Sequence, residues 1–281
     1  MEKITKILVP IDFSACSENA LVFALQLADK IKADLRLVTV LNFEGADMEN
    51  TAYALDVIEE RKVQSKKRMI KFIEKTIESV RASLDEIPTT QISIEIGNVE
   101  ATIRDVATRN QVDYVVMGTQ GENSTLDKYL GSTASNVLKN SPCPVIVIPE
   151  KSDFTKKVVI GYATDFSDAD PFEIWKVVKL FQPFEPKVKC IHFNEKQVYN
   201  EDKIKELASY FAETAPKLNI DFYSLPVKDK VKDMNDFVEN ENINMLVMYK
   251  PNRSLFESIF HKSYTQKMAK HTNVPLMVLI E

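Results

Sequence analysis

The sequence has few of the residues on which metal binding and histidine-based catalysis depend. Its 281 residues include three histidines, all in the second half, and no HxxxH pair or cysteine–histidine cluster. Such clusters supply the ligands of zinc sites, so we expect no metal site. A first half without histidine also argues against a Ser–His or Cys–His mechanism there. We therefore predict no catalytic residues.

Cysteine and long apolar runs are equally scarce. Cys16, Cys143 and Cys190 are widely spaced, odd in number and form no CxxC pair. This pattern favours reduced, buried thiols over disulfides or a redox motif. No apolar run approaches the roughly 20 residues of a membrane-spanning helix, and the N-terminus lacks the pattern of a secretory signal. We expect a cytoplasmic protein.

Positive charge is not in excess. The chain carries 36 basic and 41 acidic residues, a net charge of −5. Non-specific binding to nucleic acid or to anionic membranes depends on basic patches, so we expect neither partner. The charge-dense run EERKVQSKKR at 59–68 mixes acids with bases. We interpret it as the solvated face of a helix.

What the sequence does contain is an internal repeat. The segment from Asp113 aligns with the segment from Asn244 at a constant offset of 131 residues, without a gap and with apolar positions matched. The halves also begin alike: KILVPIDFS from Lys6 resembles KVVIGYATDFS from Lys157, which is two residues longer. Matches in the same order at both ends of each half predict a duplication. We place the two domains at 1–150 and 151–281.

Each half alternates strand-like and helix-like segments. Continuous apolar runs predict strands that are buried on both faces, and apolar residues at helical spacing predict amphipathic helices. Strands separated by helices imply right-handed crossovers and a parallel sheet covered on both faces, an α/β fold. In the first half we expect strands at 4–11, 34–41, 92–96, 113–118 and 143–149, and helices at 20–31, 53–84, 99–110 and 132–140.

Glycine is also scarce, and its distribution is uneven. Three of the six glycines fall between Gly118 and Gly131, a window that opens where the fourth strand ends and closes where a helix begins. Ligands bind outside the carboxyl ends of parallel strands. Glycine there permits a positive φ or lets backbone N–H groups approach an anion, and a helix start adds unpaired donors. The spacing alone is compatible with a phosphate cradle or with simple turns.

The spacing Gly118-x2-Gly121-x9-Gly131-Ser132 matches the ATP-binding signature of the universal stress protein family. The opening ILVPIDFS and the closing SPCPVIVIP also resemble that family, and the resemblance covers the chain as a tandem-domain member. It implies two doubly wound α/β domains, each a five-stranded parallel sheet of order 3-2-1-4-5 with helices on both faces. It also implies ATP or another adenine nucleotide, with or without Mg²⁺, as the ligand.

The resemblance assigns nucleotide contacts position by position. Asp12 would lie near the ribose and adenine, because a carboxylate accepts hydrogen bonds from a ribose diol or an exocyclic amine. The alternative for Asp12 is a cap on the following helix. Val40 would contact the adenine, and the glycines would surround the phosphates. The full set is Pro10, Asp12, Val40, Met117, Gly118, Gly121, Gly131, Ser132 and Thr133.

The second half departs from the signature. Tyr249, Asn252 and Lys262 stand where the first half has its three glycines, although Ser263 and Asp165 are retained. Tyrosine and lysine adopt a positive φ only at a cost, and their side chains would fill the cradle. We interpret this half as a degenerate copy that supports the first, with a lysine site for another anion as the alternative.

These features favour a stress-response regulatory protein that binds an adenine nucleotide in its first domain. The rivals are a slow ATPase or nucleotidyl-transfer enzyme of related fold, and an interaction module without a ligand. The resemblance further implies pairing through the last strand of each domain. That pairing would occur inside one chain, as a pseudo-dimer, or between chains, as a homodimer. The sequence identifies no protein partner.

Overall fold

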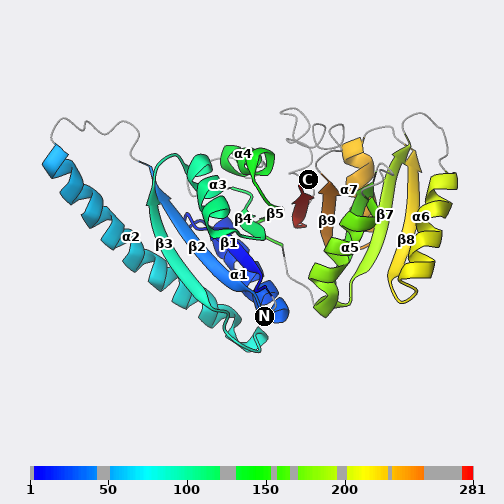
Figure 1. Ribbon diagram of the computed structural model, residues 1–281, viewed down its shortest axis with the longest axis horizontal. Coiled ribbons are helices and arrows are strands. Elements are labelled where there is room, and N and C mark those ends of the chain that lie inside the picture. Colours follow the sequence, from blue (N-terminus) through cyan, green and yellow to red (C-terminus); the bar gives the residue numbers. More distant parts are fainter. Residues whose placement is uncertain are drawn as a thin grey trace. The chain divides into compact units, whose positions relative to one another are not determined.

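The computed structural model describes residues 3–42, 51–120, 131–152, 157–164, 170–194, 201–226, 230–249 and 274–280. The chain divides into two compact units, Met1–Lys151 and Ser152–Glu281 (Figure 1).

The first unit is built on a parallel sheet. Its strands lie in the order β3-β2-β1-β4-β5, as Figure 1 shows, and each neighbouring pair is parallel. This is the predicted order 3-2-1-4-5. The central strands are apolar and buried, as expected for a sheet covered on both faces. The strands are β1 (Lys6–Pro10), β2 (Asp34–Leu41), β3 (Thr90–Ile96), β4 (Tyr114–Gly118) and β5 (Val145–Ile148).

The helices of this unit connect the strands and cover the sheet. Helix α1 packs against α2, and α3 packs against α4. Right-handed crossovers put the first pair on one face and the second pair on the other, because the direction of strand addition reverses after β3. The helices are α1 (Ala15–Ile31), α2 (Thr51–Val80), followed by the short 3₁₀ helix η1 (Arg81–Ser83), α3 (Val99–Asn110) and α4 (Ser132–Asn140).

Helix α1 illustrates why these segments are helical. Ser14 caps its start, since Ser14 Oγ accepts a hydrogen bond from the Ser17 N–H at 3.1 Å. The helix ends at Lys32, which is left-handed with φ 54°. Apolar residues recur every three or four positions, and each buried leucine stabilises the fold by about 1.5–3 kcal/mol. The buried stripe includes Ala20, Leu21, Ala24, Leu25 and Ala28.

The second unit repeats this arrangement. Its strands lie in the order β8-β7-β6-β9-β10 and pair in parallel, which is again 3-2-1-4-5. Between β9 and β10 the repeat predicts a helix equivalent to α4, but that segment lies outside the described residues. The elements are β6 (Val159–Thr164), α5 (Asp170–Phe181), η2 (Gln182–Phe184), β7 (Lys187–Asn194), α6 (Glu201–Thr214), β8 (Asn219–Pro226), α7 (Lys230–Asn240), β9 (Met245–Tyr249) and β10 (Leu276–Leu279).

The strand registers refine the alignment of the two halves. Ile7 of β1 lies opposite Tyr114 of β4, and Ile160 of β6 lies opposite Met245 of β9. Tyr114 and Met245 are related by the offset of 131, so Ile7 corresponds to Ile160 at an offset of 153. At that offset the two Asp-Phe-Ser triplets align without a gap. The two additional residues of the second half therefore precede its first strand.

Candidate functional site at the carboxyl ends of β1 and β4

The candidate site lies where the strand order of the first unit reverses. β1 pairs with both β2 and β4, and the chain leaves β1 toward β2 but leaves β4 toward β5. In open parallel sheets this divergence opens a crevice at the carboxyl ends of the two strands. Asp12 follows β1 by two residues and Gly118 is the last residue of β4. The topology therefore brings these two predicted residues to one edge.

Asp12 is an exposed carboxylate that the next turn holds in place. Its Oδ1 accepts hydrogen bonds from the Ser14 backbone N–H at 3.0 Å and from Ser14 Oγ at 2.6 Å. Ser14, in turn, is the residue that caps α1. The alternative in which Asp12 itself caps the helix is therefore wrong: Asp12 orients the capping serine and remains at the surface.

Phe13 adopts a conformation that the sequence did not signal. Its φ is 67°, a left-handed value that costs a bulky residue about 1–3 kcal/mol. Two contacts from α2 hold its ring. The Phe72 ring meets it edge-on at 5.6 Å between centroids, and the Arg68 guanidinium lies 4.0 Å from the ring centroid. Helix α2 thereby fixes the turn that carries Asp12.

Gly118 is required by close packing. A Cβ at this position would lie 2.7 Å from Cys16 Cβ and 2.8 Å from the Cys16 carbonyl carbon. Cys16 is buried in the first turn of α1, and its Sγ lies 3.7 Å from Thr119 Oγ1. The end of β4 therefore rests directly on the backbone of α1, where any larger residue would push the two elements apart.

Gly131 closes the segment that begins after β4. Its N–H donates a 2.7 Å hydrogen bond to the Thr119 carbonyl, so the chain returns to the point from which it left the sheet. Its φ of −61° is ordinary, and a Cβ would lie 3.2 Å from Thr119 O. Of the two roles that we expected for glycine here, a positive φ is therefore wrong for Gly118 and Gly131. Among the described glycines only Gly97 has one, at 145°, while Gly121 lies outside the described residues.

Of the helices α1, α3 and α4, α4 is the one that begins without a side-chain cap. Ser14 caps α1 and the Asn98 side chain caps α3, whereas Gly131 gives α4 no side-chain cap. An uncapped start presents backbone N–H groups and a partial positive charge, which together favour an anion. Ser132, which is exposed, and Thr133, which is half-buried, stand in this first turn as predicted.

The remaining predicted residues lie at or near the carboxyl ends of β1, β2 and β4. Pro10 ends β1 and Val40 lies one residue from the end of β2; both are half-buried, whereas Met117 is buried in β4. Thr39 Oγ1 donates to the Ile11 carbonyl at 2.9 Å and so ties the two strand ends together. Pro10 and Val40 are thus partly accessible, whereas Met117 is enclosed in the sheet.

The equivalent edge of the second unit has different chemistry. Tyr249 ends β9 and is buried. Within β6, Tyr162 Oη donates a 2.9 Å hydrogen bond to Asp170 at the start of α5, and Thr164 Oγ1 donates to the same carboxylate. Burial, together with the charge of Asp170, raises the pKa of Tyr162 far above its usual range. Asp165, Asn252, Lys262 and Ser263 lie outside the described residues.

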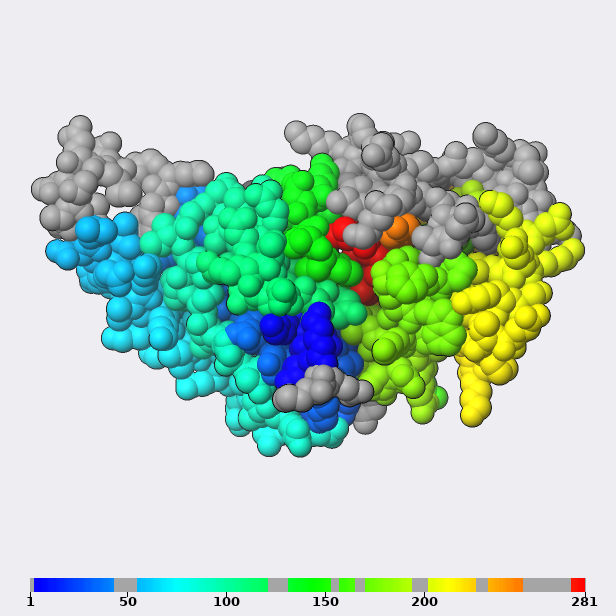
Figure 2. All heavy atoms as spheres, in the orientation of Figure 1, coloured from blue at the N-terminus to red at the C-terminus, as the bar shows by residue number. Residues whose placement is uncertain are grey.

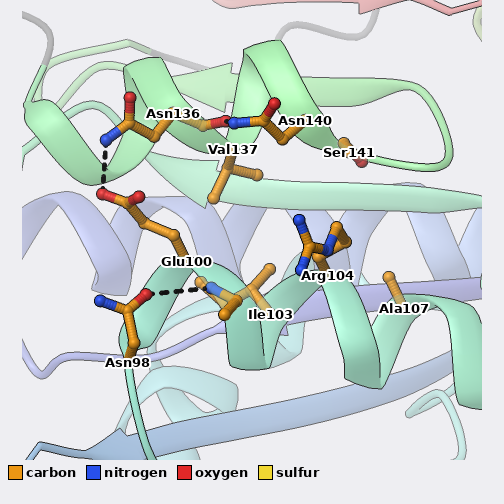
Figure 3. Close-up of a pocket in the computed structure, with 10 residues that line it drawn as sticks. Asn98, Glu100, Ile103, Arg104, Ala107, Asn136, Val137, Asn140 and Ser141 are labelled. Carbon is orange, nitrogen blue, oxygen red and sulfur yellow. Dashed lines mark hydrogen bonds between the residues drawn. The ribbon is translucent and has the colours of Figure 1, made fainter.

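Metal sites, membrane-spanning helices and pockets also bear on what the protein can bind. Within the described ranges there is no group of three His, Cys, Asp or Glu residues that could hold a metal ion. No helix found in the same ranges is both long and apolar enough to cross a membrane. A pocket of about 130 Å³ opens between α3 and α4 (Figure 3), and none of the predicted site residues lines it.

Comparison with known proteins identifies the family. A profile described as "Universal stress protein family" matches residues 3–149, just over half of the chain. The chain belongs to the universal stress protein family. A universal stress protein of Methanocaldococcus jannaschii is 26% identical over 148 residues, covering 51% of this chain and 81% of that protein. A second, from Synechocystis sp., is 28% identical over 145 residues, covering 51% of this chain and 84% of its own length.

A solved structure extends the likeness to the whole fold. The crystal structure of a universal stress protein from Archaeoglobus fulgidus has a TM-score of 0.71 and covers 98% of this chain and 96% of that one. At 18% identity it establishes the common fold alone. The α/β architecture of both units is therefore that of this family.

Proposed function

We propose that this universal stress protein is a stress-response regulatory protein whose first unit binds an adenine nucleotide, ATP or a relative of it. The observation that carries the proposal is the hydrogen bond from the Gly131 N–H to the Thr119 carbonyl. It holds the uncapped start of α4 against the end of β4, at the same edge as the exposed Asp12. An anion-binding helix start and a carboxylate together suit a ligand with phosphates and a diol.

The nucleotide would contact three parts of this edge through its phosphates, its ribose and its adenine. The phosphates would lie on the first turn of α4, where Ser132 and Thr133 add hydroxyl donors to the backbone N–H groups. Asp12 would accept hydrogen bonds from the ribose or the exocyclic amine. The adenine would pack near Val40. Mg²⁺ would arrive with the phosphates, because this ion usually keeps several waters and is bound through substrate phosphate oxygens.

A regulatory role fits the chemistry of the first unit better than catalysis. The unit has no histidine to act as a base. A nucleotide at about 100 times its dissociation constant stabilises the bound form by about 2.7 kcal/mol, which is enough to bias a two-state equilibrium. Repeated turnover of ATP by the pure protein would instead favour the ATPase alternative.

We further propose that the second unit is a degenerate copy. The same strand order in both units and the gapless alignment support a duplication. Tyr249 is buried at the position of Gly118, so the end of β9 carries a large side chain where the end of β4 has none and packs directly on α1. A universal stress protein has been solved in complex with cAMP. Its TM-score of 0.38 and 17% identity are too low to transfer that ligand to this chain.

The proposal is tested by Gly131→Asp, with Gly131→Ala as its matched control. Both variants add a Cβ at 3.2 Å from Thr119 O. Only aspartate caps the α4 amides and brings negative charge, so relative to alanine it stabilises the helix by about 0.5–2 kcal/mol while it competes with a phosphate. We expect Gly131→Asp to weaken ATP binding at least about 100-fold in titration calorimetry, with Gly131→Ala within about tenfold of wild type.

Equal loss of affinity in the two variants would instead indicate that the added Cβ, not the cap, disturbs the site. Unchanged affinity in the aspartate variant would contradict the placement of the phosphates on α4.

A further inference from the structure

A second candidate site lies between α3 and α4. These two helices form part of the visible face of the first unit in Figure 2, and Figure 3 shows the pocket between them. The pocket has a volume of about 130 Å³, comparable to about four water molecules at ~30 Å³ each. Its floor is apolar and buried, formed by Ile103, Ala107 and Val137. Its rim is polar and comes from both helices.

Two opposite charges on the rim, Glu100 and Arg104, do not pair with each other. Glu100 and Arg104 are four residues apart on α3, a spacing at which opposite charges ordinarily pair. Here the Glu100 carboxylate crosses to α4, where Oε1 accepts a 2.6 Å hydrogen bond from Asn136 Nδ2 (Figure 3). Arg104 donates no hydrogen bond to any described residue. Its ion pair with the adjacent Asp105 is exposed and 3.7 Å long.

The pocket therefore presents a guanidinium and a carboxylate one helical turn apart, over an apolar floor. In Figure 3 the Arg104 side chain is drawn between the two helices, and both Arg104 and Val137 line the pocket. Two asparagines extend the polar rim. Asn98 caps α3 through Oδ1, which leaves its Nδ2 to donate. Asn140 donates Nδ2 to the Asn136 carbonyl at 3.1 Å, which leaves its Oδ1 to accept.

We infer that this pocket binds a small zwitterion of the α-amino-acid class. The ligand carboxylate pairs with Arg104, the ammonium group pairs with Glu100, and a short side chain covers Ile103 and Val137. The Glu100 carboxylate is held by Asn136 and makes no ion pair with Arg104 among the described residues, so a zwitterion with one carbon between its charged groups can lie between the two side chains. The small volume selects against large side chains. The inference is independent of the nucleotide proposal, because no nucleotide contact is involved.

The direct test is an NMR titration of the full-length, ¹⁵N-labelled protein with L-alanine. We expect saturable shifts of amide signals in α3 and α4, including the side-chain amides of Asn98, Asn136 and Asn140. Propionate and ethylamine each carry one half of the zwitterion. Each should bind at least about tenfold more weakly, because one charge-assisted contact is lost. L-Phenylalanine should bind more weakly than alanine if the pocket volume limits the side chain.

Arg104→Gln provides the variant and Arg109→Gln the matched control. Both change the same charge on α3, but Arg109 pairs with Glu95 at 2.9 Å and lies outside the pocket. We expect Arg104→Gln to weaken alanine binding at least about tenfold and Arg109→Gln to leave it unchanged. Linear, unsaturable shifts would overturn the inference, as would propionate binding equal to alanine or equal losses in the two variants. Thermal melts establish that both variants are folded.

Discussion

At the scale of single residues, the turn after β1 depends on a phenylalanine in a strained conformation. Phe13 keeps its φ of 67° because the Phe72 ring and the Arg68 guanidinium hold its ring. Conformational strain of this kind occurs where the surrounding structure over-determines a residue, and it gathers near functional sites. Asp12, directly before it, is the candidate ribose contact. The strain thus lies beside the proposed ligand.

The strain predicts an unusual order of stability for two variants of Phe13. Phe13→Gly and Phe13→Ala both lose the ring contacts, but only alanine retains the cost of a positive φ. We expect the glycine variant to have the higher free energy of unfolding, by about 1 kcal/mol. Urea denaturation measures the difference. An alanine variant as stable as the glycine variant would show that the turn is not strained.

Asp29 supplies a second prediction at this scale. Its side chain is fully buried and accepts hydrogen bonds from the backbone N–H groups of Asp85 at 3.0 Å and Glu86 at 2.9 Å. Burial alone would raise the pKa of Asp29. The two backbone hydrogen bonds and the nearby Lys30 and Lys32 outweigh it and lower the pKa below its usual value. A lowered pKa means that the folded state favours the charged carboxylate.

The sign of this shift fixes the pH dependence. The stabilisation is complete above the unfolded pKa of about 3.9 and disappears as the pH falls through the lower, folded pKa. We expect Asp29→Asn to reduce the free energy of unfolding by about 1–3 kcal/mol at pH 7, and by progressively less below about pH 4. The exposed Asp85→Asn is the control. A deficit that does not shrink in acid would show that the charge of Asp29 is not the cause.

At the scale of elements, two glycines join β4 to its neighbouring helices in different ways. The Gly118 position faces the Cys16 backbone and Cβ at under 3 Å, whereas the Gly131 position approaches one carbonyl oxygen at 3.2 Å. Backbone in a packed interior moves only at a cost of about 1–3 kcal/mol. The contact between β4 and α1 should therefore be the more sensitive of the two.

Alanine substitutions test this difference. We expect Gly118→Ala to lower the free energy of unfolding by about 1–3 kcal/mol, because α1 and β4 must separate, and Gly131→Ala to lower it by less. Thermal and urea unfolding of both variants measure the comparison. If Gly131→Ala were the more destabilising, the tight junction would lie at α4 and not at α1.

The elements themselves could be predicted closely where periodicity was strong. The bounds of β2 and α3 agree with the predicted segments 34–41 and 99–110, because a buried strand and an amphipathic helix leave distinct apolar patterns. The physical reasons for the glycines could not be predicted. Gly118 is explained by Cys16, a residue 102 positions earlier in the chain. Such tertiary proximity leaves no local pattern in a single sequence.

The candidate site shows the same division. From the sequence we could predict that Asp12 and the start of α4 lie at one edge, because parallel strands bring their carboxyl ends together. It did not indicate the positive φ of Phe13, because the conformation is maintained by side chains of α2. Nor did it indicate the pocket between α3 and α4, which joins Glu100 to Asn136 across two elements.

At the scale of the whole molecule, two units of the same topology differ in chemistry at equivalent edges. With the offset of 153, Val9 corresponds to Tyr162 and Ser17 to Asp170, so the second unit has a buried tyrosine–carboxylate pair between β6 and α5 where the first has a buried valine and serine. Tyr249 replaces Gly118. The second unit therefore has larger side chains at positions that valine, serine and glycine hold in the first. The central claim is therefore an asymmetry in which one unit binds and the other does not.

Stoichiometry tests this asymmetry most directly. Native mass spectrometry of the full-length protein with ATP or AMP counts the nucleotides on each chain. Our account predicts one nucleotide per chain in the wild type and none in Gly131→Asp. Two nucleotides per chain would contradict the degenerate second unit, and none at saturating concentrations would contradict the nucleotide site itself.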